Sequence, residues 1–364
     1  MTPGIVAGAV YLLISPHEPW GRSFPNEIDV QAWMNFLKSW LDHLGVLISL
    51  VLVSLIAIPR LRDPEVRVAI FLWLAAGSSM HAGPPLGMAM LGLVLLWSVV
   101  VSGERAVNAS GKGALGVHLL VLGAPSLTFA AAPLGFQWLA ERVRQRKELI
   151  MVLGWLSLGG LLIWHFDLVS RNRFIYLWSE YLHIWERPLI DWMTPIVVLL
   201  SDPVLLMAAP GTMFLRRLGA SPWLRWTLGL TLILGLLGTP ASGVAIFFAL
   251  APLISLSIGS FLDREIAARS LWLGVVLGSV AASLHQNRFK TLSLDWVQPW
   301  WIKFGFPTWL GSGVQLLILA AAFYLVFRSG LRVGGFKARL ARIGTSIGVA
   351  VLSAMLIALA HQWS

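Results

Sequence analysis

The stretch 42–59, DHLGVLISLVLVSLIAIP, decides the fold class of this chain. After Asp42 and His43, no charged side chain follows until Arg60. A helix that crosses the hydrocarbon core of a bilayer needs about 20 mostly apolar residues. We therefore predict that 42–59 is a transmembrane helix.

The composition of the whole chain agrees with a membrane location. The 364 residues are 57% hydrophobic and only 12% charged, and the mean hydropathy is +0.77. A soluble domain carries about 25% charged residues. This balance excludes a soluble enzyme, a disordered chain and a nucleic-acid-binding domain. The net charge of +10 is then explained by membrane topology and not by affinity for nucleic acid.

Similar apolar runs recur along the chain and predict an all-α polytopic integral membrane protein with about 11–13 transmembrane helices. The predicted spans are 3–16, 42–59, 67–82, 84–102, 149–166, 189–212, 222–238, 242–261, 270–285, 307–327 and 343–361. The stretch 114–139 is ambiguous. Its Pro125 and Pro133 allow either one kinked span or a short re-entrant pair.

The positions of Lys and Arg predict which side of the membrane each loop faces. Six short clusters between spans hold 19 of the 27 basic residues. The clusters are Arg60, Arg62 and Arg67; Arg105 and Lys112; Arg142, Arg144, Arg146 and Lys147; Arg216, Arg217 and Arg225; Arg264 and Arg269; and Arg328, Arg332, Lys337, Arg339 and Arg342. Basic loops stay in the cytoplasm, so we expect an inner-membrane protein with these loops inside. Both flanks of 114–139 are then cytoplasmic, which a hairpin would satisfy.

Three longer segments, 17–41, 167–188 and 286–306, are then predicted to lie outside. They are rich in Trp, which prefers the membrane–water interface. In 31–41 apolar residues recur at helical spacing, which predicts amphipathic helices along the outer surface. The sequence Asn-Arg-Phe starts at 172 and again at 287, a weak sign of an internal repeat. We expect an N-terminal part, 1–148, and a C-terminal part, 149–364, joined in one continuous membrane domain.

The first functional hypothesis is a membrane-embedded enzyme that transfers or hydrolyses a lipid-linked or anionic substrate at the outer leaflet. Seven of the eight His are predicted to lie on the outer side, where an imidazole beside a carboxylate could act as a base. The candidate catalytic residues are His165, Asp167, His285 and Glu180, and the candidate substrate-binding residues are Arg171, Arg173 and Arg288. The alternative is that they are ordinary interfacial polar residues and headgroup anchors. An enzyme requires these groups to converge on one reacting atom.

The second hypothesis is a permease or flippase with a midplane site near Asp202. This is the only acidic residue well inside a predicted span, where a carboxylate is costly and is by default a functional candidate. Pro203 beside it predicts a broken helix, as in discontinuous transporter helices. The alternative is a buried Asp202 that caps the half-helix starting at Pro203. The permease hypothesis predicts a midplane cavity beside Asp202, and a dry, packed neighbourhood around this residue would count against the hypothesis.

The third hypothesis is a non-catalytic subunit of a larger membrane complex, because the 34 Gly allow close packing with partner helices. Membrane lipids are expected partners in every case, and nucleic acid is not. The absence of Cys excludes thiolate chemistry and disulfides. No local spacing of His predicts a metal site, so any cofactor is left open.

Overall fold

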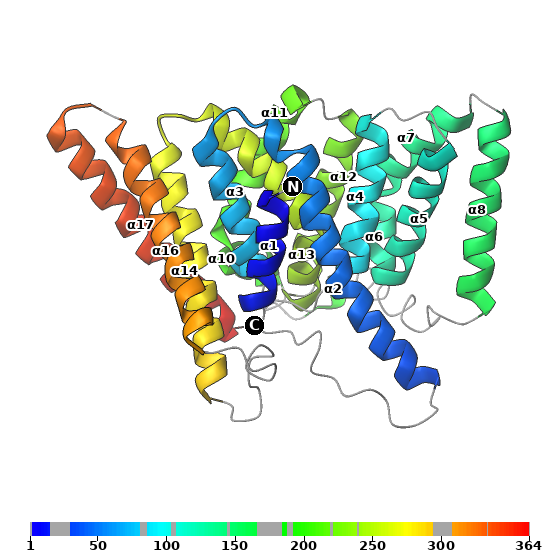
Figure 1. Ribbon diagram of the computed structural model, residues 1–364, viewed down its shortest axis with the longest axis horizontal. Helices are drawn as coiled ribbons and strands as arrows, with labels where there is room; N and C mark the ends of the chain where they lie inside the picture. Colours follow the sequence, from blue (N-terminus) through cyan, green and yellow to red (C-terminus); the bar gives the residue numbers. More distant parts are fainter. Residues whose placement is uncertain are drawn as a thin grey trace.

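The computed structural model describes residues 2–14, 30–80, 86–102, 107–143, 146–165, 184–187, 192–218, 221–238, 240–293, 308–332 and 334–363. Every regular element in these ranges is a helix (Figure 1). Several of the helices are long and apolar enough to cross a membrane. The chain is therefore an all-α polytopic membrane protein, as the sequence predicts.

The helices follow the predicted spans closely, and each predicted span overlaps at least one of them. The first half contains α1 Thr2–Ile14, α2 Val30–Ile56, η1 Ile58–Arg60, α3 Pro64–Ala76, η2 Ser78–Met80, α4 Gly87–Ser102, α5 Val107–Gly123, α6 Pro125–Ala130, α7 Ala132–Val143 and α8 Arg146–His165. The second half contains η3 Ile184–Glu186, α10 Thr194–Ser201, η5 Pro203–Met207, α11 Ala208–Phe214, η6 Leu215–Leu218, α12 Pro222–Leu237, α13 Pro240–Arg264, α14 Arg269–Ser293, α16 Thr308–Leu331 and α17 Phe336–Trp363.

Among the described residues, four helical stretches are long and apolar enough to span a bilayer. They are Phe36–Arg60, Ala245–Arg264, Trp309–Leu331 and Phe336–Gln362. A fifth is formed if Thr194–Ser201 and Pro203–Phe214, which meet at an angle of 101°, are counted as one broken span. The other predicted spans are shorter or less apolar helices, among them Pro3–Ile14, Gly87–Val101, Leu149–Trp164 and Pro222–Leu237.

The ambiguous stretch 114–139 is a helical hairpin. The descending arm is α5, the chain breaks at Ala124 before Pro125, and α6 and α7 return. A Cβ atom on Gly113 of α5 would lie 2.2 Å from the ring of Trp138 on α7, so the two arms lie against each other. Of the two alternatives that the sequence leaves open, a pair of helices is the one observed. The side of the membrane on which its flanks lie stays a prediction.

The predicted amphipathic segment 31–41 is helical, and it continues without a break into the following span as α2. Trp33 packs edge-on against Phe36, with ring centroids 5.9 Å apart, and Phe36 contacts Trp40 at 6.0 Å. The start of α2 projects beyond the neighbouring helices (Figure 1). The aromatic turns therefore extend the span and do not form a separate helix. The predicted outer segments 167–188 and 286–306 lie almost wholly outside the described residues.

The helices pack around α13, which lies in the middle of the assembly (Figure 1). This helix contacts α3, α4, α10, α11 and α12, and most of its apolar stretch is buried. The two ends of the long axis are formed by α8 on one side and by α16 and α17 on the other (Figure 1). Exposed apolar side chains cover these end helices, as expected for surfaces that face lipid.

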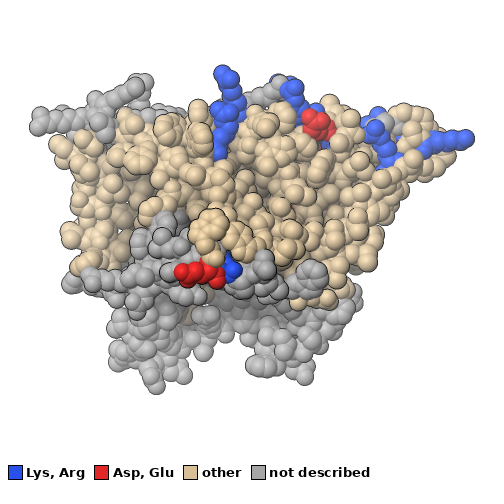
Figure 2. Space-filling view, turned by 180° about the vertical axis from the view of Figure 1, so that it is seen from behind, with Lys and Arg blue, Asp and Glu red and all other residues tan. Residues whose placement is uncertain are grey.

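Most of the described Lys and Arg side chains gather at one end of the molecule, above a band of uncharged surface (Figure 2). We call this end the basic rim. It includes the start of α3, the start of α14 and the end of α16, where ion pairs join Asp63 and Glu65 to Arg269, Arg328 and Arg332. The predicted sidedness, with this rim toward the cytoplasm, stays a prediction.

Small residues bring helices α14 and α17 into close contact. A Cβ atom on Gly274 would lie 2.4 Å from the carbonyl oxygen of Ser346, and one on Gly278 would lie 2.5 Å from that of Ala350. Gly274 and Gly278 are four residues apart and form the Gly-x-x-x-Gly pattern that allows membrane helices to touch through their backbones. Dispersion contacts along this seam replace the hydrophobic driving force that is missing in lipid.

We expect Gly274→Ala to lower the free energy of unfolding by about 1–3 kcal/mol, because overpacking a tight interface costs this much. Gly344→Ala and Gly348→Ala on α17 are matched controls, since a Cβ atom at either position meets nothing within 4 Å. The controls should change the stability by no more than about 1 kcal/mol. Denaturation of the purified protein in mixed micelles measures all three, and equal losses would contradict the described packing.

Candidate functional site

An interrupted helix meets the end of another helix in the interior of the protein. Helix α3 ends at Ala76, and Gly77 leads into the short helix η2. The interruption lies at Asp202, between α10 and η5. Pro203 causes it, because proline has no N–H to continue the helix and forces the preceding residue into an extended conformation. Asp202 accordingly has φ −149° and ψ 92°.

The carboxylate of Asp202 joins this break to the end of α3. Its Oδ1 accepts a hydrogen bond from the backbone N–H of Val204 at 3.1 Å, which caps η5. Its Oδ2 accepts from the indole Nε1–H of Trp73 at 2.9 Å and from the backbone N–H of Ser79 at 3.1 Å. Asp202 has no exposed surface. The cap proposed from the sequence is confirmed, and the second oxygen adds one bond to α3 and one to η2.

Three serine residues complete this arrangement. The hydroxyl of Ser78 donates to the carbonyl oxygen of Ser201 at 2.8 Å, which would otherwise lack a partner at the end of α10. The backbone N–H of Ser78 donates to the hydroxyl oxygen of Ser279 on α14 at 3.1 Å. Within a bilayer, backbone groups freed by a helix break must find protein partners. The hydrogen bonds of Ser78 to Ser201 and Ser279 provide such partners.

We call this cluster the Asp202 node, and it consists of Trp73, Ser78, Ser79, Ser201, Asp202 and Ser279. Its members come from η2, α14, the end of α3 and the α10–η5 break. Trp73 is fully buried, and each of the four serines is at least nine-tenths buried. A carboxylate held by three N–H donors in such surroundings is a structural junction. Within the described residues, no group of three or more His, Cys, Asp or Glu side chains could hold a metal ion.

The sequence identifies Asp202 and its break but misses the rest of the node. Trp73 lies 129 positions away in the chain, and Ser279 lies 201 positions from its partner Ser78. The available signal is Gly77-Ser78-Ser79, which places polar residues near the predicted outer end of the apolar span 67–82. Trp73 also stands inside its span and not at the end, where most Trp of the chain are found.

The helices that carry the two candidate catalytic His residues lie far apart. His165 ends α8 and His285 lies in α14, and these helices are at opposite ends of the long axis (Figure 1). His285 is exposed. Arg288 lies in the same helix, but its side chain is outside the described part. The structure therefore does not bring His165 and His285 together.

The remaining candidates for an outer active site, Asp167, Arg171, Arg173 and Glu180, lie outside the described residues. Their roles stay predictions. Two other His residues make local contacts: Nδ1 of His43 is 2.7 Å from the carbonyl oxygen of Ser39, and Nε2 of His118 is 3.3 Å from that of Leu156.

A second polar cluster ties helices together at the basic rim. Asp63 forms an ion pair with Arg269, and its carboxylate oxygen lies 3.4 Å from Arg332. Glu65, which is almost fully buried, lies 3.1 Å from both Arg328 and Arg332. Burial alone would raise the pKa of Asp63, but the backbone N–H of Glu65 and the guanidinium of Arg269 outweigh it and lower the pKa. The cluster joins α3, α14 and α16 at their ends.

Comparison with known proteins finds no matching protein family, no matching curated protein and no matching solved structure. The functional argument therefore depends on the geometry of the chain itself.

We expect Asp202→Ala to lower the free energy of unfolding by about 3–5 kcal/mol, because three buried N–H donors lose their acceptor at about 1–3 kcal/mol each. Ser255→Ala is a matched control: this buried hydroxyl donates only to the carbonyl of Pro252 in its own helix, at 2.6 Å. The control substitution should lower the free energy of unfolding by about 1 kcal/mol or less. Denaturation in mixed micelles compares the two variants, and equal losses would rule out the bridging role of Asp202.

Proposed function

We propose that this protein is a membrane permease or flippase, and that the Asp202 node is the junction about which its helices move. The observation that carries the proposal is the break between α10 and η5, whose buried carboxylate also binds the end of α3 and η2. Interrupted helices inside the membrane are typical of secondary transporters. A static bundle of continuous helices would avoid both the break and the buried charge.

The energetics support a moving element at this place. Breaking a helix inside a bilayer frees backbone groups, and burying a carboxylate there is costly. The protein carries both features, and besides the local cap to Val204 it satisfies them with bonds between segments. Such bonds can be exchanged when the half-helices tilt. Breaks of this kind also absorb backbone rotation, which a continuous helix resists.

Asp202 acts in this proposal as a positioning residue and not as a substrate ligand. The carboxylate is fully buried and already accepts three hydrogen bonds, so a substrate would have to displace one of them. These dry surroundings count against the midplane cavity that the permease hypothesis expects beside Asp202, so the proposal depends on the helix break alone. The transported molecule would be bound elsewhere, and described acidic residues inside the spans are too few to support a proton relay.

The enzyme hypothesis draws on groups that lie mainly outside the described residues, and its two His-bearing helices stand at opposite ends of the molecule (Figure 1). The subunit hypothesis predicts a rigid interior. Transport and a rigid scaffold therefore differ in whether the Asp202 node opens to water, and this difference can be measured without knowing the substrate.

The absence of native Cys makes single-cysteine labelling free of background. Ser79→Cys places a thiol in the node while the backbone N–H of residue 79 keeps its bond to Asp202. In sealed right-side-out and inverted vesicles, we expect a small charged methanethiosulfonate reagent to reach this thiol from at least one side. A state populated at about 0.1–10% is enough to give measurable labelling.

Ser346→Cys is the matched control, because Ser346 is equally buried but packs in the seam between α14 and α17. The proposal predicts that the thiol at position 79 reacts about tenfold faster or more than the thiol at 346, and faster still when Asp202→Asn weakens the junction. Equally slow labelling of both thiols from both sides would overturn the proposal and would favour the scaffold.

A further inference from the structure

The ion pairs at the start of α3 consist of two halves, of which the first is rigid. Asp63 accepts a hydrogen bond from the backbone N–H of Glu65 at 2.9 Å and forms an ion pair with Arg269. Arg269 is itself almost fully buried, and it donates to the carbonyl oxygens of Leu262 at 2.8 Å and of Asp263 at 3.1 Å. Every part of this half is therefore bonded, and it holds α3 to the α13–α14 connection.

The second half joins α3 to the end of α16 and is much looser. The side chain of Glu65 is 2% exposed, whereas those of its partners Arg328 and Arg332 are 49% and 48% exposed. Both guanidinium groups approach Oε1 of Glu65 to 3.1 Å, but neither carboxylate oxygen accepts a hydrogen bond of normal geometry from a described residue. The carboxylate is held by charge alone, unlike Asp202, which accepts three N–H groups.

This looseness makes the second half easy to open. A buried carboxylate without hydrogen bonds is costly to keep closed, and half-exposed ion pairs contribute little stability. When α16 moves away, the two guanidinium groups regain water and Glu65 reaches the surface. Helix α16 lies near one end of the long axis, and its exposed apolar side chains meet lipid, so no packed helix blocks its outer face (Figure 1).

A gap at this place would lead toward the Asp202 node. Helix α3 runs from the basic rim to the node, and from Glu65 to Trp73 it covers eight helical steps, or roughly 12 Å. Helix α14 runs in parallel from Arg269 at the rim to Ser279 at the node. The two clusters therefore hold opposite ends of the same pair of helices, and α16 contacts both helices.

We propose that Glu65, Arg328 and Arg332 form a latch that closes the basic rim between α3 and α16, and that its release opens this side of the protein. The latch rests on the transport function proposed above, for which it supplies a gate. The ion pair of Asp63 with Arg269 stays closed in both states, so α16 moves while α3 and α14 remain together.

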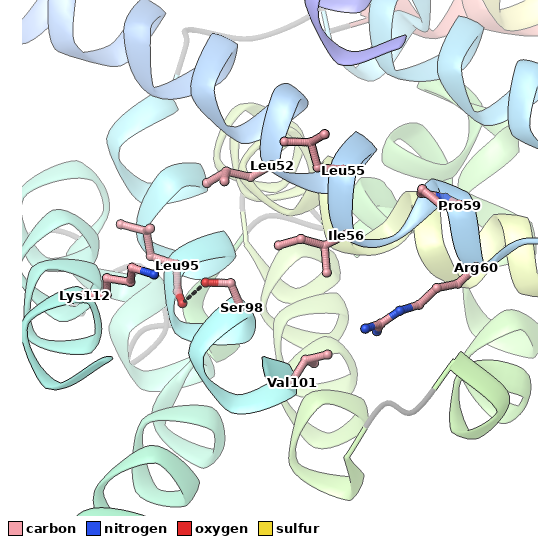
Figure 3. Close-up of a pocket in the computed structure, with 9 residues that line it drawn as sticks. All are labelled: Leu52, Leu55, Ile56, Pro59, Arg60, Leu95, Ser98, Val101 and Lys112. Atoms are coloured by element: carbon pink, nitrogen blue, oxygen red, sulfur yellow. Dashed lines mark hydrogen bonds between the residues drawn. The ribbon is translucent and has the colours of Figure 1, made fainter. Parts of the chain in front are cut away.

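The latch is separate from a pocket of about 530 Å³ between α2, α4 and α5 (Figure 3). Leu52 and Ser98 are among the residues that line the pocket, and none of the latch residues is. Helices α4 and α5 lie on the opposite side of α3 from α16 (Figure 1). A bulky substitution in this pocket is therefore a control for general loosening of the bundle.

The test measures the distance between α3 and α16 in the purified full-length protein, reconstituted in lipid nanodiscs. The chain has no native Cys, so nitroxide labels can be attached at Val68→Cys in α3 and Leu331→Cys in α16, both of which are exposed. Pulsed electron paramagnetic resonance should give one main distance in the otherwise unchanged protein. Glu65→Gln should add a longer distance, because its open population rises about tenfold from the roughly 0.1–10% typical of a minor state.

Three controls separate the latch from nonspecific effects. Glu265→Gln removes a carboxylate at the same rim that forms no ion pair with a described residue, and it should leave the distance unchanged. Ser98→Phe, which fills the pocket, should also leave it unchanged. Labels at Val68→Cys and Leu271→Cys, on α3 and α14, should keep their distance in Glu65→Gln because Asp63 and Arg269 stay paired.

Raising the salt concentration tests the latch without any substitution in it. At about 1 M NaCl the Debye length falls to about 3 Å, which weakens the half-exposed pairs of Arg328 and Arg332 and should add the same longer distance. The proposal is overturned if neither Glu65→Gln nor high salt adds this distance, or if a control substitution or the α3–α14 pair changes as much.

The outcome is distinguishable from failure of the transport proposal. If the longer α3–α16 distance appears but the thiol at position 79 stays unlabelled, the latch is supported and the transport function is not. If that thiol is labelled while the α3–α16 distance never changes, transport is supported and the latch is overturned.

Discussion

The hydrogen bonds to the carboxylate of Asp202 are the interaction on which the centre of this structure depends. One helix is interrupted within the bundle and a second helix ends beside it, and both leave backbone groups that cannot bond to water inside a bilayer. One carboxylate can accept several N–H groups at once, which neither a hydroxyl nor an amide does as strongly. Asp202 binds one N–H from its own half-helix and two donors from α3 and η2. The cost of burying a charge is thus offset where these segments must be joined.

The rest of the architecture can be understood as support for this junction. Helices α3, α13 and α14 surround it, and α14 contributes the hydroxyl of Ser279. At the basic rim, the pairs of Asp63 and Glu65 with three Arg residues fix the ends of α3, α14 and α16. The polar interactions are therefore concentrated at the interior node and at the rim. Between them the helices pack through small residues and apolar side chains, which allow tilting more readily than ion pairs do.

Much of the fold can be predicted from the sequence, because the bilayer imposes long apolar helices and proline ends them. The helices at the predicted spans, the hairpin allowed for 114–139 and the cap at Asp202 depend on local signals and are observed, and four or five of these helical stretches are long and apolar enough to span a bilayer. The partners of Asp202 could not be predicted, since Trp73 is brought to it only by tertiary packing. The same applies to the contact of Asp63 with Arg269, 206 positions away. The outer segments that carry Asp167, Arg171, Arg173 and Glu180 lie outside the described residues, so the predicted outer site has no geometry to support it.

The most direct test of the account is a double-mutant cycle between Trp73 and Asp202, with Trp73→Phe, Asp202→Ala and the double variant denatured in mixed micelles. The account holds that the indole N–H of Trp73 and the carboxylate join α3 to the α10–η5 break. The effects of the two substitutions are then not additive, and the coupling free energy is about 1–3 kcal/mol. A coupling within about 0.3–0.5 kcal/mol of zero, which is the range for independent sites, would contradict the junction at Asp202.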